Sequence, residues 1–191
     1  MPLVNSSSNS TSRKKRKIET SIRQMEIDDI SAVYRLGERL FTSDEFPILY
    51  RTWDPYEVTD YFTSDPGYCL VAEVDGKIVG FILATTIEKE GTAWKKYGYL
   101  SWIGVDEAYQ GTNLGFRLYR RLEEKLREDG VRMVIADTEA ENEKAIAFFA
   151  ALGFLLSREH VWLAKTLRRS GRKSVKARLV PVSSDKTEDA K

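Results

Sequence analysis

Hydrophobic residues recur along the chain with two spacings, which predict a series of helices and strands. From Ile30 to Leu40 they fall on one helical face, and Asp28 or Asp29 can cap the start of that helix. Asp54-Pro55 is typical of a helix start, so a second helix is predicted to run to about Ser64. Further helices are predicted at Thr112–Asp129 and Asn142–Leu152, and strands at Ile22–Met25, Tyr68–Val74, Lys77–Lys89, Tyr97–Val105, Val131–Asp137, Phe154–Leu156 and Val161–Ala164.

The order of these elements predicts a mixed α/β domain. Asp75-Gly76 is a strong hairpin signal, so the strands on either side of it should be antiparallel. The strand, helix and strand between Tyr97 and Asp137 instead predict a parallel crossover, and the apolar Val131–Asp137 segment is predicted to be buried on both faces. Gly130 and Gly153 follow the last two helices, where they can supply C-terminal caps.

Charge divides the chain into three parts. Residues 1–20 carry five Lys or Arg and one acid, residues 166–191 carry eight and three, and residues 21–165 carry 17 bases and 25 acids. The first part is polar and lacks apolar periodicity, so we predict a disordered basic N-terminal tail at residues 1–20. A flexible basic tail is also predicted at residues 168–191, which leaves a single domain at residues 21–167.

The rare residue types exclude several kinds of site. Cys69 is the only cysteine and His160 the only histidine, so no intramolecular disulfide and no Cys/His zinc site can form, and no metal is expected. We interpret Cys69 as buried and inert, and His160 as structural. No run approaches the ~20 apolar residues of a membrane helix. We therefore expect a cytoplasmic protein without a membrane partner, with a nuclear location open because Arg13–Lys17 suits a localisation signal.

The segment between Val105 and Phe116 carries the first chemical signal. A predicted strand ends there, a turn with Gly111 and Gly115 follows, and a helix begins at once. Backbone N–H groups at a helix N-terminus, together with the helix dipole, make a site suited to phosphate. Glycine allows a ligand to approach closely, and Asn113 tolerates left-handed angles better than most residues.

A second segment, one strand later, makes this signal more specific. It contains Asn142, Ala145-Ile146, Phe148-Phe149 and Leu152-Gly153-Phe154. Together with Gln110-Gly111-Thr112-Asn113-Leu114-Gly115, it resembles the two signatures of the GNAT family of acyl-CoA-dependent N-acetyltransferases, in pattern closest to ribosomal-protein N-terminal acetyltransferases. The resemblance covers about 145 residues, from Ile22 to about Leu167, and leaves out both tails.

The resemblance implies a fold and a set of cofactor contacts. The fold is a central, mostly antiparallel sheet with a splayed parallel pair and about four helices. Acetyl-CoA would place its pyrophosphate on Gln110, Gly111, Thr112, Asn113, Leu114 and Gly115, and its pantetheine along Ile103, Gly104 and Val105. Asn142 and Phe149 would also contact the cofactor. Asn113 departs from the family pattern because it stands where a glycine is usual.

Phe149 occupies the place of the tyrosine that often protonates the departing thiolate. Phenylalanine cannot donate a proton. Either the thiolate leaves largely unaided, or another group takes the role; Tyr97, Tyr99 and Cys69 are the alternatives.

The base can be argued from the residues themselves. An amine nucleophile must lose a proton, and a nearby carboxylate can accept it. Asp137 and Glu139 lie two apart after an apolar strand, so in an extended chain they share one face. Family members related to ribosomal-protein N-terminal acetyltransferases carry a glutamate five residues before the asparagine, and this position is Asp137 here, which we favour over Glu139.

The acceptor pocket is expected between Thr42 and Tyr61, where family members vary most. Four of its aromatic residues could line the pocket or pack on the core, namely Phe46, Tyr50, Trp53 and Tyr56, and Asp44 or Glu45 could hold a cationic amine.

The leading hypothesis is an enzyme that transfers acetyl from acetyl-CoA to a primary amine by direct attack, through an oxyanion held by backbone N–H groups of Ile103–Val105. A non-catalytic acyl-CoA-binding module is one alternative, favoured by Phe149. A ribosome- or nucleic-acid-associated protein that uses its basic tails is another. The acceptor, which could be a protein N-terminus, a lysine or a small amine, and the choice between monomer and dimer stay open.

Overall fold

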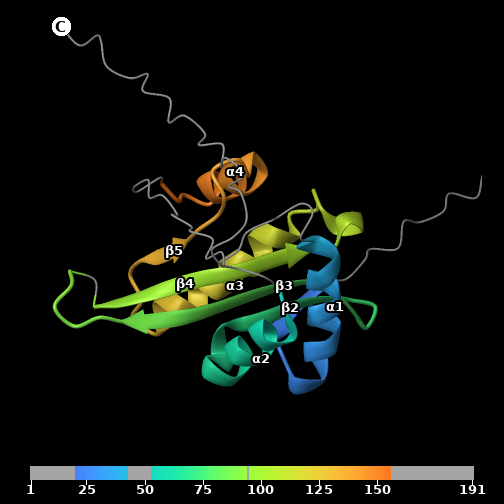
Figure 1. The fold of residues 1–191 in the computed structure, drawn as a ribbon, viewed down its shortest axis with the longest axis horizontal. Helices are drawn as coiled ribbons and strands as arrows, with labels where there is room; N and C mark the ends of the chain where they lie inside the picture. Colours follow the sequence, from blue (N-terminus) through green and yellow to red (C-terminus); the bar gives the residue numbers. More distant parts are fainter. Residues whose placement is uncertain (1–19, 43–52, 94, 156–191) are drawn as a thin grey trace, which may run out of the picture. The chain divides into compact units, whose positions relative to one another are not determined.

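The computed structural model describes residues 20–42, 53–93 and 95–155. They form a five-stranded sheet of order β1-β2-β3-β4-β5, accompanied by four α-helices (Figure 1). The first four strands are antiparallel to their neighbours, and β5 runs parallel to β4. The strands are β1 (Thr20–Gln24), β2 (Cys69–Val74), β3 (Lys77–Glu88), β4 (Lys96–Val105) and β5 (Val134–Ala136); the helices are α1 (Ile30–Leu40), α2 (Pro55–Ser64), α3 (Leu114–Glu128) and α4 (Glu143–Ala151). The predicted mixed sheet with a parallel pair and four helices is confirmed.

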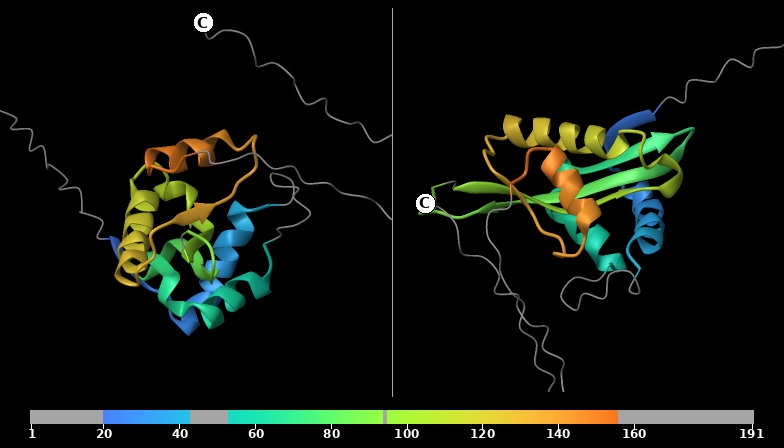
Figure 2. Two further views of the ribbon diagram at one scale, coloured as in Figure 1. Left: turned by 90° about the vertical axis from the view of Figure 1, so that its left-hand side faces the viewer. Right: turned by 90° about the horizontal axis from the view of Figure 1, so that it is seen from above.

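Helices cover both faces of the sheet, with α3 on one side and α1 and α2 on the other (Figure 2). On the α3 face, Leu118 and Leu122 pack with Leu100 of β4. On the opposite face, Val33 and Leu36 of α1 and Val58 of α2 pack with strand residues and with Trp53 and Trp102. These two hydrophobic clusters hold the strands from which the candidate site is built.

Several predicted element ends are confirmed by local hydrogen bonding. The Asp54 side chain accepts the N–H groups of Tyr56 (2.8 Å) and Glu57 (3.1 Å), and Pro55 opens α2. Asp75 and Gly76 both have positive φ, 48° and 75°, as a tight hairpin between β2 and β3 requires.

Asp29 has a different role from the predicted one. Its side chain makes no cap hydrogen bond to α1, which is preceded by a short 3₁₀ helix at Ile27–Asp29. Instead the carboxylate accepts the backbone N–H of Glu26 (2.8 Å) and pairs with Arg23 of β1 (2.6 Å). The hydrogen bond from Arg23 holds the pKa of Asp29 below its usual range. The pair therefore ties the start of the helical segment to the edge strand.

The predicted strand at Val131–Asp137 is wrong in extent and burial. Only Val134–Ala136 form β5, and Ile135 is 40% exposed. The apolar sequence suggested a fully covered strand, but helix α3 covers one face only.

Several predictions fall outside the described residues. They concern the two tails, the strand at Val161–Ala164, His160, and Asp44, Glu45, Phe46 and Tyr50 of the acceptor segment. The domain limits at residues 21–167 therefore stay predictions. Across the described part of the chain, no helix is long and apolar enough to cross a membrane.

Candidate active site

Strands β4 and β5 are paired for only part of the length of β4. Leu100 pairs with Ala136, the last residue of β5, and β4 then continues to Val105 with no strand partner on that side among residues 20–42, 53–93 and 95–155. The implied splayed parallel pair is therefore present. A gap of this kind leaves the edge of a strand open to an extended ligand.

A β-bulge lies where the two strands separate. Trp102 pairs with Leu83 of β3, whereas Leu100 pairs with Ala84, so Ser101 is an extra residue in β4. The bulge changes which residues face each way: Leu100 packs on the α3 side, and so does Ile103, while Trp102 packs on the side of α1 and α2. Sequence reasoning missed it, although the aliphatic positions do shift from even to odd numbers after Leu100.

Tyr99 and Asp137 meet at the point of separation. The Tyr99 hydroxyl donates a hydrogen bond to the Asp137 carboxylate at 2.7 Å. Because Gly98 and Leu100 face α3, strand alternation directs Tyr99 to the opposite face of the sheet. The pair thus combines a proton donor and a half-buried carboxylate beside the bulge.

Glu139 is placed differently from Asp137. Strand β5 ends at Ala136, so the extended geometry from which a shared face was predicted does not reach Glu139. The backbone carbonyl of Glu139 accepts the N–H of Asn142 (3.0 Å) in the turn that leads into α4.

The predicted phosphate site is a turn with left-handed residues at the start of α3. Gly111 has φ 75° and Asn113 has φ 67°, and the helix begins at Leu114. The first helical hydrogen bond is donated by Arg117 to the Asn113 carbonyl (3.1 Å), so the N–H groups of residues 114–116 point out of the helix end. Asn113 therefore adopts the conformation that glycine would supply.

Gly115 lies close to helix α4. A Cβ atom at this position would lie 3.2 Å from the ring of Phe148 on α4. A side chain there would therefore contact Phe148, so a substitution at Gly115 tests the packing of α3 on α4 as well as ligand binding. Gly111, by contrast, has no atom within 4 Å of such a Cβ.

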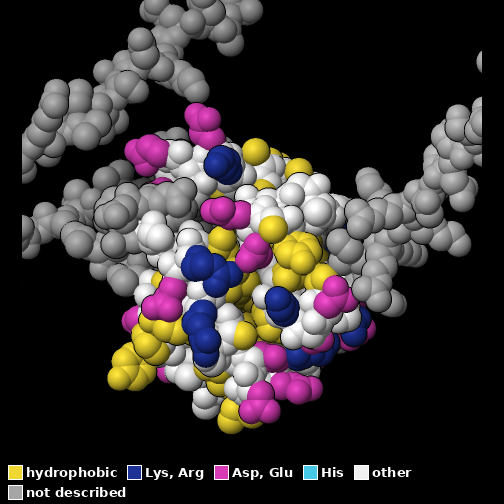
Figure 3. Space-filling view, turned by 90° about the vertical axis from the view of Figure 1, so that its right-hand side faces the viewer, with side chains coloured by type: hydrophobic (Ala, Val, Ile, Leu, Met, Phe, Trp, Pro, Cys, Tyr) yellow, Lys and Arg dark blue, Asp and Glu magenta, His cyan; other side chains and the backbone are white. Residues whose placement is uncertain are grey.

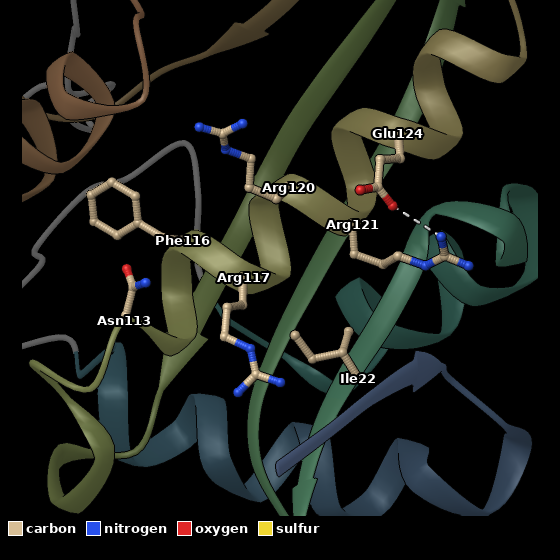
Figure 4. Close-up of a pocket in the computed structure, with 7 residues that line it drawn as sticks. All are labelled: Ile22, Asn113, Phe116, Arg117, Arg120, Arg121 and Glu124. Carbon is tan, nitrogen blue, oxygen red and sulfur yellow. Dashed lines mark hydrogen bonds and ion pairs between the residues drawn. The ribbon is translucent and has the colours of Figure 1, made fainter.

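An arginine-rich groove continues from this turn along the outer face of α3 (Figure 4). Arg117 donates to the Thr20 carbonyl (2.9 Å) and Arg121 pairs with Glu124 (3.0 Å). Arg120 has no such partner among the described residues, and its side chain extends into solvent. The groove, of about 450 Å³, is lined by Ile22, Asn113, Phe116, Arg117, Arg120, Arg121 and Glu124.

Two residues of the second signature have structural roles. The Asn142 side chain caps α4 by accepting the N–H of Ala145 at 3.1 Å. Phe149 packs against the cluster on the α3 face, with its ring centroid 5.2 Å from that of Phe154. Neither role requires a ligand.

Among the aromatic residues predicted near the acceptor, Trp53 belongs to the core. It is 9% exposed, and its ring stacks on Tyr34 and also contacts the rings of Phe41, Phe81 and Trp102. Tyr56, on α2, is 75% exposed. Of the two alternatives for these aromatic residues, lining the acceptor pocket or packing on the core, Trp53 therefore shows the second.

A contact that sequence reasoning missed joins α2 to the bulge. The Trp102 indole donates a hydrogen bond to the Glu57 carboxylate at 2.6 Å. Glu57 lies in the first turn of α2 and is half-buried. No sequence signal pairs these two residues, which are 45 positions apart.

Cys69 is fully buried, and burial raises the pKa of its thiol to about 12. A buried thiol with so high a pKa is a poor candidate for a proton donor to the leaving thiolate. Within the described residues no group of His, Cys, Asp and Glu side chains has the arrangement of a metal site.

Comparison with known proteins shows that the chain is similar to acetyltransferases. The Acetyltransferase (GNAT) family profile matches residues 34–154. A mycothiol acetyltransferase of Sanguibacter keddieii is 35% identical over 101 residues, which cover 53% of this chain and 32% of that protein. This chain therefore aligns with about a third of the length of that relative. N-alpha-acetyltransferase 30 of Schizosaccharomyces pombe is 25% identical over 104 residues, 53% of this chain and 68% of that protein.

The fold is also shared with solved structures. An aminoglycoside N-acetyltransferase, AAC(6')-Iy in complex with CoA, superimposes with a TM-score of 0.64 at 20% identity, covering 80% of this chain and 98% of that one.

Proposed function

Because the chain belongs to the GNAT family of acetyltransferases, we propose that it is an enzyme that transfers acetyl from acetyl-CoA to a primary amine. The observation that carries the proposal is the Tyr99–Asp137 pair, held at 2.7 Å where β4 and β5 separate. A module that only senses acyl-CoA has no need of a hydroxyl and a carboxylate at that point.

The residues at the start of α3 suit the cofactor. The outward N–H groups of residues 114–116 and the helix dipole provide a site for the pyrophosphate. Arg120 adds a positive charge next to it without an ion pair in the described structure. The edge of β4 beyond Leu100 offers backbone groups of Ile103, Gly104 and Val105 to pantetheine and to the oxyanion.

Tyr99 and Asp137 can together handle both protons of the reaction. Asp137 accepts a proton from the amine nitrogen as the new C–N bond forms. When the C–S bond breaks, the Tyr99 hydroxyl gives its proton to the sulfur and regains one from Asp137 through their hydrogen bond. In this assignment Tyr99 supplies the proton that Phe149 cannot donate. It also favours Tyr99 over the buried Cys69 as the proton donor.

The acceptor is the finer part of the proposal. The match to N-alpha-acetyltransferase 30 and the position of Asp137, five residues before Asn142, support an acceptor like a protein N-terminus. The basic tails, outside the described residues, would then serve to bring the enzyme to a ribosome or nucleic acid.

Acetyl-CoA binding tests the cofactor site most directly. We expect titration calorimetry to show binding that Asn113→Asp weakens about tenfold or more, because a carboxylate would face the pyrophosphate. Asp tolerates left-handed angles and favours a helix N-terminus, so the fold should be retained.

Asn113→Gly is the matched control, since glycine keeps the backbone conformation and adds no charge. It should bind acetyl-CoA as well as the wild type. Equal affinity of all three proteins would place the cofactor elsewhere and contradict the proposed site.

A further inference from the structure

Within the described part of the chain, the two faces of the sheet differ at the bulge. On the α3 side, Leu100, Ile103 and Val105 are covered by the hydrophobic cluster of α3. Tyr99 faces the opposite side, and its partner Asp137 lies with it. An acceptor that delivers a proton to Asp137 must therefore lie on the face shared by α1 and α2.

Glu57 is the charged group that α2 brings to β4 on that face. Its carboxylate accepts the indole N–H of Trp102, the first residue after the bulged Ser101. The indole packs between Phe41 and Trp53, with ring centroids 4.8 and 5.1 Å away, so it holds the carboxylate in one place. In the described part of the chain only Trp102 donates a side-chain hydrogen bond to this carboxylate.

A half-buried carboxylate that accepts one side-chain hydrogen bond has unused acceptor capacity. A second ammonium group is the complement for such a carboxylate, and a pair shielded in part from water is stronger than an exposed one. On the other side of the bulge, Asp137 is positioned for the reacting nitrogen.

We propose that Glu57 is a specificity-determining residue that selects acceptors with a second positive charge a few bonds from the reacting amine. The proposal rests on the proposed acetyl transfer and names its substrate class as diammonium acceptors. They could be a free diamine or a peptide whose second residue is basic, since both present the same pair of charges.

The test compares acceptors that differ only in the second charge. With acetyl-CoA saturating, kcat/KM is measured for 1,4-diaminobutane against n-butylamine. It is also measured for two short peptides that carry lysine or norleucine at position two. We expect the wild type to prefer the doubly charged member of at least one pair by about tenfold, as one partly shielded charge pair allows.

Glu57→Gln removes the charge but keeps an oxygen that can accept the indole N–H, so the fold should be retained. It should lower kcat/KM for the preferred doubly charged acceptor by about tenfold and leave the singly charged member within about twofold. Asp60→Asn is the matched control, because Asp60 is an exposed acid on the same helix. It should leave the preference unchanged, and thermal melts should show both variants folded.

Three results would overturn the proposal. Equal kcat/KM for both members of each pair, or a preference that Glu57→Gln leaves intact, would show that Glu57 only ties α2 to β4. Equal losses in Glu57→Gln and Asp60→Asn would assign the preference to the overall field of the protein. All three leave acetyl transfer in place, whereas binding of acetyl-CoA without transfer to any amine would overturn the proposed function as well.

Discussion

At the scale of single residues, the two candidate bases lie in different surroundings. Asp137 and Glu139 are two positions apart, and both are half-buried. Asp137 accepts a hydrogen bond from Tyr99 across the parallel pair, whereas Glu139 contributes its backbone to the turn before α4. A base needs a fixed position relative to its substrate, which supports Asp137.

Asp137→Asn should separate catalysis from binding. Asparagine can still accept the Tyr99 hydrogen bond but cannot take a proton from an amine. We expect kcat to fall about 10²- to 10⁴-fold, with the affinity for acetyl-CoA unchanged. Steady-state kinetics and calorimetry on the same preparation would show this.

Glu139→Gln is the paired control, since it neutralises the other candidate base. We expect it to change kcat by less than about threefold, because the turn before α4 does not place the Glu139 side chain beside Tyr99. A larger loss in Glu139→Gln than in Asp137→Asn would reverse the two assignments.

At the scale of elements, ends set by local chemistry were predictable and packing was not. Asp54 and the Asp75-Gly76 turn act within a few residues, so their sequences were sufficient to place the start of α2 and the β2–β3 hairpin. Which face of β5 is buried, and where the Trp53 side chain packs, depend on residues far away in the sequence. Both were mispredicted or left open for that reason.

Gly37 shows how tightly α1 is seated. It is buried in the helix, and a Cβ atom there would overlap the Trp53 indole, whose N–H donates to the Tyr34 carbonyl at 3.0 Å. We expect Gly37→Ala to lower the free energy of unfolding by about 1–3 kcal/mol, because overpacking outweighs the better helix propensity of alanine. Urea denaturation measures this change.

Gly67→Ala provides the comparison, since no atom lies within 4 Å of a Cβ at that position. Its effect should be within about 0.5 kcal/mol. Equal stability of Gly37→Ala and the wild type would mean that Trp53 can move without cost, which its packing contradicts.

At the scale of the whole molecule, residues 21–165 carry more acids than bases, but the face in Figure 3 shows no single acidic region among the described residues. On the face in Figure 3, Lys and Arg side chains alternate with Asp and Glu. Long-range steering of a cationic acceptor needs a region of one sign. On that face, recognition of a cationic acceptor would depend on individual carboxylates rather than on a region of one charge.

Cys69 reports on unfolding of the whole sheet. It lies fully buried in β2, and its pKa of about 12 leaves little thiolate at neutral pH. We expect a thiol reagent to label it only at the rate at which the protein unfolds, and more slowly with acetyl-CoA bound. Labelling followed at increasing urea concentrations tests this.

A variant with Cys69→Ser and Ser64→Cys supplies the control, because residue 64 is exposed at the end of α2. It should react at once in native buffer. Equally fast labelling of Cys69 would show that β2 opens locally, which is not what its position in the sheet predicts.

The sequence by itself determined the order of the elements, most of their ends, the left-handed turn before α3 and the family signatures. These features depend on contacts within a few residues, or on motifs that a single segment contains. Only the tertiary structure decided where β4 and β5 separate, that Ser101 forms a bulge there, and that Tyr99 meets Asp137. It also decided that Glu57 reaches Trp102 from 45 residues away. Such contacts arise from strand register and helix packing, which no local pattern encodes.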